Sequence, residues 1–467
     1  MRRFFLISLL FCYFFSFSEE ILTISEIVIS GNKVTKEEII IRELEFKKSD
    51  NLSISDLNEK IKKSKYNLIN LKIFNFVEIN HSKIDNVIKI NIDVVEQWYI
   101  WPYPIFEISE RNFNTWWKEF SKSKFSDFSR LNYGVFLNWN NFRGRNEILL
   151  LKFRKGFKEH YLLSYQIPYF NKQQNIGINT NLQLFRRKKS FYKTEKNRLV
   201  YYEDENNFTT RDYEIHSELL YRNKLNKSHK IKFHYFETIA ASIIVAENSN
   251  YLRSNNTKGS YSKISYEYTN ENRDYIEYPL GGNYFQISTS KYIAGLSPVK
   301  NFEILGHIEK HGEICKNLFV GSSFKGKWSS SSYQPYFMQV ALGFDDYVRG
   351  YEYYVVDGQD YWLSKNAIKY AIVPKKTFEI PYLKMDQFNK SHYSLFLGFF
   401  SDLGYVIDKQ TNLQNPLANT VLWSSGVSLD YVTYYDKLLR IEFSINHLGE
   451  KGVFLHFSNP FGTKKEL

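Results

Sequence analysis

Cysteine is almost absent from this sequence, which has Cys12 and Cys315 among its 467 residues. Cys12 lies in an N-terminal apolar segment that has the features of a cleaved leader, so the mature chain keeps Cys315 alone. Phe11 precedes Cys12 where a lipid attachment site needs a small residue, which disfavours lipidation. With no internal disulfide, the mature chain must be held together by hydrogen bonds and burial.

Long apolar runs are missing beyond this leader. Arg2 and Arg3 precede an apolar stretch from Phe4 to Phe17, and the run Ser16–Ser18 offers a small-residue exit. We predict a signal peptide over residues 1–18. After it, no apolar run reaches the roughly 18 residues that a spanning helix needs. The chain is therefore predicted to be exported, and to enter a membrane, if it does, as strands.

Enzyme motifs are also lacking. The sequence has no H-E-x-x-H, G-x-S-x-G or G-x-x-x-x-G-K pattern and no His/Cys cluster with metal-ligand spacing. We predict no catalytic residue, cofactor or metal. The net charge is +12, but it is scattered through loops such as 186–189 and forms no basic face interleaved with aromatics, so nucleic acid is not an expected partner. Anionic lipid head groups suit this charge better.

Residues 21–97 have the pattern of one small α+β domain. Isoleucine and valine alternate with polar residues over 87–96, which predicts a strand buried on one face. In the second helix, apolar residues and Ser64 recur at helical spacing from Leu57 to Leu68. The predicted elements are a strand at 24–30 with a turn at Gly31–Asn32, a helix from the capping box Thr35–Glu38 to about Leu44, a helix capped by Ser55, and strands at 74–79 and 87–96.

The segment Trp98–Pro104 marks the next boundary. Its prolines are expected to end the strand pattern, and its four aromatic residues cluster at the junction. Such a cluster fits the lipid–water interface of a membrane protein and fits a packed hinge between domains equally well.

Period-2 alternation dominates residues 105–461. One face of each segment is apolar and the other polar or charged, as in Leu439–Asn446. A soluble sandwich would bury the apolar face against a second sheet, whereas a membrane barrel turns it to lipid and encloses the polar face. The leader, the missing helices and an aromatic content of 18% favour the barrel. At roughly 20–24 residues per strand and connection, the segment predicts about 16 antiparallel strands.

Two short motifs carry a family resemblance. Val348-Arg349-Gly350-Tyr351 and the later Phe400-x-Asp402-x-Gly404 resemble the V-R-G-Y loop and F-x-D-x-G strand motifs of the BamA/TamA-like outer-membrane assembly and secretion proteins. The order of elements in residues 21–97 resembles a POTRA domain. This resemblance implies that the loop folds into the barrel lumen, that Arg349 pairs with Asp402 on the lumen wall, and that the pair docks the loop there. The alternative is an ordinary exposed arginine in a turn.

The chain end adds a weaker signal. Gly452, Leu455 and Phe457 fit the family's C-terminal insertion signal, although a tail at 462–467 extends past it. The resemblance implies a non-enzymatic assembly or insertion factor in the Gram-negative outer membrane, with the POTRA domain in the periplasm. Unfolded outer-membrane or secreted client proteins, outer-membrane lipid and accessory subunits would be its partners. A dedicated secretion pore and a passive channel or surface antigen remain as alternatives.

Overall fold

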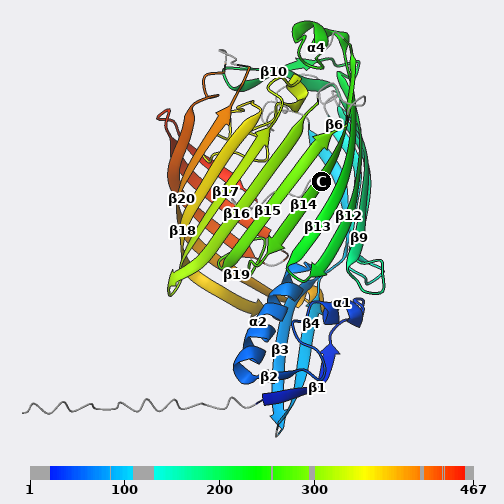
Figure 1. The fold of residues 1–467 in the computed structure, drawn as a ribbon, viewed down its shortest axis with the longest axis vertical. Coiled ribbons are helices and arrows are strands. Elements are labelled where there is room, and N and C mark those ends of the chain that lie inside the picture. Colours follow the sequence, from blue (N-terminus) through cyan, green and yellow to red (C-terminus); the bar gives the residue numbers. More distant parts are fainter. Residues whose placement is uncertain are drawn as a thin grey trace, which may run out of the picture.

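The computed structural model describes residues 21–457 except 85, 109–130, 254–255, 294–299, 411–414, 434 and 436. The predicted signal peptide at 1–18 and the tail at 462–467 lie outside the described residues. The chain forms a small N-terminal α+β domain beneath a large barrel-shaped sheet (Figure 1). Within the described residues, no helix combines the length and the apolar character needed to cross a membrane.

The N-terminal domain is a four-stranded sheet in the order β2-β1-β4-β3, in which β1 and β4 are parallel. Isoleucine and leucine side chains from the sheet and both helices meet in its buried core; Ile40, Leu57, Leu68, Ile90 and Ile92 are wholly buried. The elements are β1 (Ile21–Ser30), α1 (Glu37–Arg42), β2 (Asn51–Ser53), α2 (Ile54–Asn70), β3 (Phe74–Ile84) and β4 (Val87–Glu96).

Both predicted helix caps are wrong by one or two residues. Helix α1 has Lys36 at its N-cap and no side-chain cap, because Thr35 is buried and its hydroxyl instead contacts the Tyr99 hydroxyl at 3.1 Å. Helix α2 is capped by Ser53, whose Oγ accepts a 3.2 Å hydrogen bond from the Asp56 amide, and not by Ser55. Tertiary contacts thus override the local capping pattern at Thr35.

The barrel is one antiparallel sheet of 16 strands, ordered along the chain from β5 to β22, with β10 and β11 set apart as a separate hairpin. The prediction of a mainly β chain with about 16 barrel strands is confirmed. The strands are β5 (Ile100–Ile108), β6 (Leu131–Phe142), β7 (Glu147–Gly156), β8 (Lys158–Ile167), β9 (Ile176–Arg187), β12 (Thr210–Lys224), β13 (Lys227–Ala240), β14 (Lys258–Glu271), β15 (Gly282–Tyr292), β16 (Phe302–Cys315), β17 (Leu318–Ser329), β18 (Asp360–Glu379), β19 (Lys390–Ile407), β20 (Val421–Thr433), β21 (Lys437–Asn446) and β22 (Lys451–His456).

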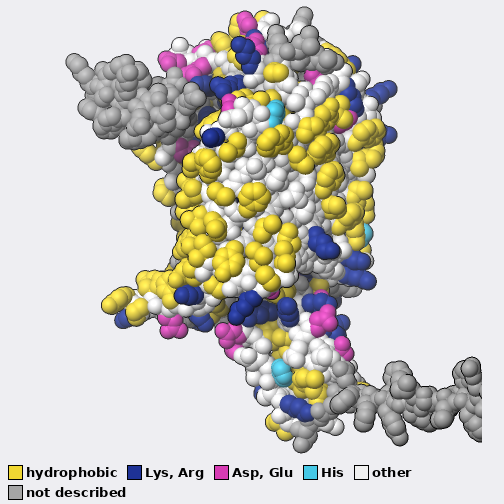
Figure 2. All heavy atoms as spheres, turned by 90° about the vertical axis from the view of Figure 1, so that its left-hand side faces the viewer, with side chains coloured by type: hydrophobic (Ala, Val, Ile, Leu, Met, Phe, Trp, Pro, Cys, Tyr) yellow, Lys and Arg dark blue, Asp and Glu magenta, His cyan; other side chains and the backbone are white. Residues whose placement is uncertain are grey.

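The barrel strands turn their apolar side chains outward. On β20, for example, Trp423 and Val427 are 47% exposed, whereas Ser424 and Asp430 between and beyond them are buried. Figure 2 shows hydrophobic side chains spread over the face of the barrel that it displays, with basic side chains near both ends. This is the arrangement expected of a sheet whose outer face contacts lipid and whose inner face lines a polar lumen.

The first barrel strand begins earlier than predicted. Strand β5 starts at Ile100 and runs through Pro102 and Pro104, which pair in register with Leu137 and Val135 of β6. Prolines are tolerated there because β5 is an end strand of the sheet and pairs with β6 alone among the described strands. The prediction that these prolines end the strand pattern is therefore wrong.

The two ends of the barrel differ. At the end away from the N-terminal domain lie the hairpin of β10 (Lys189–Glu195) and β11 (Arg198–Glu203) and the helix α4 (Ser242–Glu247) (Figure 1). At the other end, β18 and β19 continue below their neighbours and are joined through α5 (Asp386–Asn389). The N-terminal domain meets this lower end.

Candidate functional site

The segment between β17 and β18, residues 330–359, carries the V-R-G-Y motif. It contains one short 3-10 helix, η1 (Tyr336–Met338), and an antiparallel bridge between Leu342 and Val356 that closes its inner part. From this base the motif reaches side chains of β18 to β21 on the inner face of the barrel. We call residues 339–357 the lumen loop.

Arg349 and Asp402 lie in direct contact. Arg349 Nε donates to Asp402 Oδ2 at 2.7 Å, and Nη2 donates to Oδ1 at 2.5 Å, so the carboxylate accepts two parallel hydrogen bonds. The Arg349 backbone amide adds a third bond to Oδ2 at 3.3 Å. Arg349 is 1% exposed and Asp402 0%, so water does not screen this pair.

Other wall residues complete the surroundings of Arg349. Its Nη2 also donates to the backbone oxygen of Asn366 at 3.2 Å, and its guanidinium carbon lies 3.9 Å from the centre of the Phe400 ring. Nη1 is 3.6 Å from Glu442 Oε1. A buried guanidinium with this set of partners is held in one position, and removing it would leave the buried Asp402 carboxylate without the guanidinium that pairs with it.

Gly350 and Tyr351, the last two residues of the motif, hold the loop against β21 and the turn that follows it. Gly350 adopts a φ of +87°, and a side chain there would also approach Ser444 Oγ to 3.0 Å. Its carbonyl accepts a 2.9 Å hydrogen bond from Asn446 Nδ2 on β21. The Tyr351 hydroxyl is hydrogen-bonded to His447 Nδ1 in the turn after β21.

Gly404 makes room for Val348. A Cβ atom on Gly404 would lie 2.6 Å from Val348 Cγ2 and 3.2 Å from Leu342 Cδ1. Both apolar side chains are buried in a cluster inside the barrel that also includes Val406 and Leu422. The glycine of F-x-D-x-G therefore leaves the space that the loop valine fills, while the aspartate of the same motif holds the loop arginine.

A second group of contacts, which the sequence did not reveal, joins the lumen loop to the last strand. His456 Nε2 on β22 lies 3.2 Å from Glu442 Oε2 and 3.4 Å from Glu352 Oε1 of the loop. The Tyr347 ring stacks on the His456 ring at 5.8 Å, and Arg440 Nε lies 2.8 Å from Glu442 Oε1. These residues come from the lumen loop, β21 and β22 and share no local motif, so only the fold brings them together.

Asp346 of the lumen loop has specific partners on the barrel wall. Its carboxylate lies 2.7 Å from Lys325 Nζ on β17 and accepts a 2.7 Å hydrogen bond from the Tyr361 hydroxyl on β18. The loop is thus tied to walls on both sides of the Arg349 contact.

The predicted C-terminal signal residues lie on β22 and just after it. Gly452 pairs with Ser444 of β21, and Leu455 pairs with Ile441. Leu455 is 56% exposed and Phe457 73%, and both are on the outward face of the barrel wall. Strand β22 forms one end of the 16-stranded sheet and pairs with β21 alone among the described strands.

The N-terminal domain is joined to the barrel through a buried carboxylate. Glu43, at the end of α1, is 0% exposed and accepts two hydrogen bonds from the Arg222 guanidinium of β12, at 2.7 and 2.9 Å. Arg42 and the Tyr169 hydroxyl also contact Glu43. Burial alone would raise the pKa of Glu43, but Arg222 and Arg42 outweigh it and hold that pKa below its ordinary value.

Two further contacts lie around this junction. The Gly144 carbonyl, in the turn after β6, accepts a 3.0 Å hydrogen bond from the Lys36 amide. On the opposite side, the β18–β19 connection meets β3: the Asn75 side chain donates to the Gln387 carbonyl at 2.8 Å, and the Lys390 ammonium lies 4.8 Å from the centre of the Phe76 ring.

Comparison with known proteins identifies the N-terminal domain and shows which solved structures the whole fold resembles. The family model for POTRA, described as a surface antigen variable number repeat, matches residues 22–97. The whole structure is similar to CdiB from Escherichia coli, with 10% sequence identity and a TM-score of 0.53, covering 94% of this chain and 75% of that chain. The chain has the POTRA-and-barrel fold of the BamA/TamA-like family. The predicted resemblance, with one POTRA domain, is confirmed.

Two other solved structures match this POTRA-and-barrel chain with lower TM-scores. BamA from Haemophilus ducreyi lacking POTRA domains 1–3 matches at 14% identity and a TM-score of 0.49, over 94% of this chain and 84% of that chain. CdiB from Acinetobacter baumannii matches at 13% identity and 0.46, over 93% and 73%. No curated protein sequence matches the chain.

Proposed function

We propose that this chain is an outer-membrane insertion factor, with its POTRA domain in the periplasm, that acts non-enzymatically on unfolded client proteins. The observation that carries the proposal is the pair of sheet ends in the barrel. Among the described strands, β5 and β22 each pair with one neighbouring strand, and β22 spans six residues, Lys451–His456. A short end strand offers unpaired backbone groups to a client strand at the membrane.

The POTRA domain supplies a second place for client chains. Strands β2 and β3 are the ends of its sheet, and β3 is 11 residues long with an exposed second half. An extended client segment can add to such an end strand through main-chain hydrogen bonds. In this mechanism the client pairs with the POTRA domain first and with the barrel afterwards.

The packing of the lumen loop favours insertion over secretion through the lumen. A polypeptide crossing the lumen would have to displace the loop, and with it the Arg349–Asp402 contact and the buried cluster around Val348. Insertion at the sheet ends leaves these contacts in place. The lumen loop then serves as a support for the wall formed by β18 to β21.

The direct test is a folding assay in liposomes. Vesicles that contain the purified mature chain are expected to speed the folding of a second, urea-unfolded β-barrel protein, measured by its shift in gel mobility without heating. Empty vesicles and vesicles with a passive porin are the controls. A rate equal to both controls would contradict the proposal and favour a passive channel or surface antigen.

A locked loop separates insertion from secretion. In a Cys315→Ser background, Val348→Cys and Gly404→Cys place a sulfur near the position of Val348 Cγ2, 2.6 Å from the new Cβ, which is within reach of a disulfide. We expect the oxidised double variant to keep its insertion activity. If insertion activity disappears on oxidation and returns with reductant, the loop must move during activity. A dedicated secretion pore would then be the better-supported function.

A further inference from the structure

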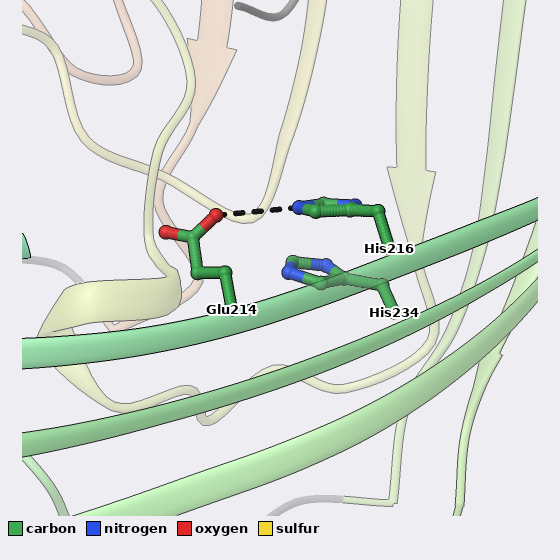
Figure 3. A group of neighbouring side chains, drawn as sticks. All are labelled: Glu214, His216 and His234. Carbon is green, nitrogen blue, oxygen red and sulfur yellow. Dashed lines mark hydrogen bonds and ion pairs between the residues drawn. The ribbon is translucent and has the colours of Figure 1, made fainter. Parts of the chain in front are cut away.

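Two histidines and one glutamate converge on the lumen side of strands β12 and β13, far along the chain from the lumen loop. Figure 3 shows Glu214 and His216 pointing toward one another, with the His234 ring stacked beside His216. His216 Nε2 lies 3.2 Å from Glu214 Oε2, and the two imidazole rings are 3.8 Å apart and nearly parallel. The sheet register sets this meeting, because His216 and His234 are directly opposed.

All three side chains face the polar interior. Their neighbours Tyr213 and Ile215 on β12 and Phe233 on β13 are exposed on the outer face, so the alternate residues turn inward. The side chains of Glu214 and His216 retain 20% and 31% of their exposure, which leaves them open to solutes in the lumen.

The donor set suits a divalent transition-metal ion. One carboxylate oxygen and two imidazole nitrogens lie within 4.8 Å of one another. In a tetrahedral zinc site with bonds of about 2.1 Å, donor atoms lie about 3.4 Å apart. The separation of 3.2 Å between Glu214 and His216 is close to this value, and the His234 side chain would rotate to complete the set. Imidazole with carboxylate selects zinc, copper or nickel over calcium and magnesium.

A second observation supports a ligand at this place. Nε2 of His234 is buried and has no hydrogen-bond partner among the described residues, and the same holds for Oδ1 of Asn181. Asn181 lies on β9 directly beside His216 in the register. One of these atoms belongs to the histidine pair and the other lies beside it, so a bound ion or water at this place would satisfy both.

One cation lies opposite this site in the sheet. Lys263 of β14 is paired with His234 in the register, and its ammonium lies 5.7 Å from the centre of the Tyr292 ring. The other candidate donor group, Glu352 with Glu442 and His456, is different: two guanidinium groups, of Arg349 and Arg440, contact Glu442 and oppose a bound cation.

We propose that Glu214, His216 and His234 form a binding site for one divalent transition-metal ion on the lumen wall, with the fourth coordination position open to the lumen. No sequence motif marks this site, because two donors are spaced as i and i+2 on one strand and meet the third only across the β12–β13 ladder of 13 residue pairs. The site does not depend on whether the chain inserts or secretes proteins.

The test uses the full mature chain, purified in detergent without a histidine tag, and Zn²⁺ titrated by calorimetry. We expect one Zn²⁺ per chain, and at least about a tenfold weaker affinity in each of Glu214→Gln, His216→Gln and His234→Gln, since even loss of an outer-shell partner costs that much. His229→Gln, on the outer face of the same strand β13, is the matched control and should bind as the parent does.

Co²⁺ gives an independent measurement that needs no variant. Its visible absorption should report tetrahedral nitrogen and oxygen ligation, and bound Zn²⁺ should protect His216 and His234 from modification by diethylpyrocarbonate, read by mass spectrometry. Absence of Zn²⁺ binding by the parent chain, or equal affinity in the control and the three site variants, would overturn the proposal. Modification of both histidines at the same rate with and without Zn²⁺ would overturn it as well.

Discussion

The POTRA domain and the barrel use the same alternation in opposite directions. In β4 of the POTRA domain, Ile88, Ile90 and Ile92 are buried and the residues between them face water. In β20 of the barrel, the apolar residues are exposed and the polar ones are enclosed. A period of two therefore specifies a strand with two unlike faces, and the solvent on each side decides which face is the inside.

The enclosed polar face makes the barrel depend on ion pairs where the POTRA domain depends on apolar packing. The largest expected effect is therefore that of Arg349→Glu, which sets a third carboxylate against Asp402 and Glu442. Breaking such a buried pair destabilises by about 3–5 kcal/mol. The measurement is urea unfolding of the chain in lipid vesicles.

Charge reversal provides the control for this prediction. Asp402→Arg added to Arg349→Glu should restore part of the stability, and Arg211→Glu, an exposed change at the rim on β12, should have little effect. If Arg349→Glu and Asp402→Arg, each made alone, leave the stability unchanged and the double variant restores none, the contact does not hold the loop.

An arginine at an exposed apolar position should have unlike effects in the barrel and in the POTRA domain. Val427→Arg, at the middle of β20, should destabilise the barrel by about 2–4 kcal/mol because the side chain would lie in lipid. Ile84→Arg, on the POTRA strand β3 and 72% exposed, should change stability by less than about 0.5 kcal/mol. Equal effects at the two sites would mean that the outer face of the barrel does not contact lipid.

A smaller effect is expected from Gly404→Ala. The added methyl would lie 2.6 Å from Val348 Cγ2, so the loop must shift, at a cost of about 1–3 kcal/mol. Val348→Ala in the same chain should recover most of this loss. Gly306→Ala is the matched control, because a Cβ on that strand glycine meets nothing within 4 Å. A loss as large in the control would point to a general effect of strand glycines.

The smallest effect is expected for a change of pH at the junction of the POTRA domain and the barrel, where the docking of the two should not vary near pH 7. The pKa of Glu43 is held below its ordinary value of 4.5, so its pairing with Arg222 contributes fully above that pH and weakens as the pH falls through the lowered pKa. Cross-linking between the POTRA domain and the barrel should be constant near pH 7 and decline under acid. In Glu43→Gln this acid-dependent decline should be absent, and an unchanged decline would exclude Glu43 as its cause.

The sequence predicted the features that repeat or that occupy adjacent positions. Strand alternation, repeated over many segments, indicated the barrel and its strand number, and the two short motifs pointed to Arg349 and Asp402. The sequence could not indicate that Glu442 contacts His456. It also could not indicate that Glu43 contacts Arg222, which lies 179 positions later in the chain. Those contacts depend on register and docking, which no local pattern encodes.

Strand β19 has one more consequence. It begins at Lys390, which touches the POTRA residue Phe76, and twelve residues later it carries Asp402, which grips Arg349. This part of β19 spans about 40 Å along the strand. If the chain acts on clients as proposed, a pull on the POTRA domain at β3 would therefore reach the lumen loop along this one strand.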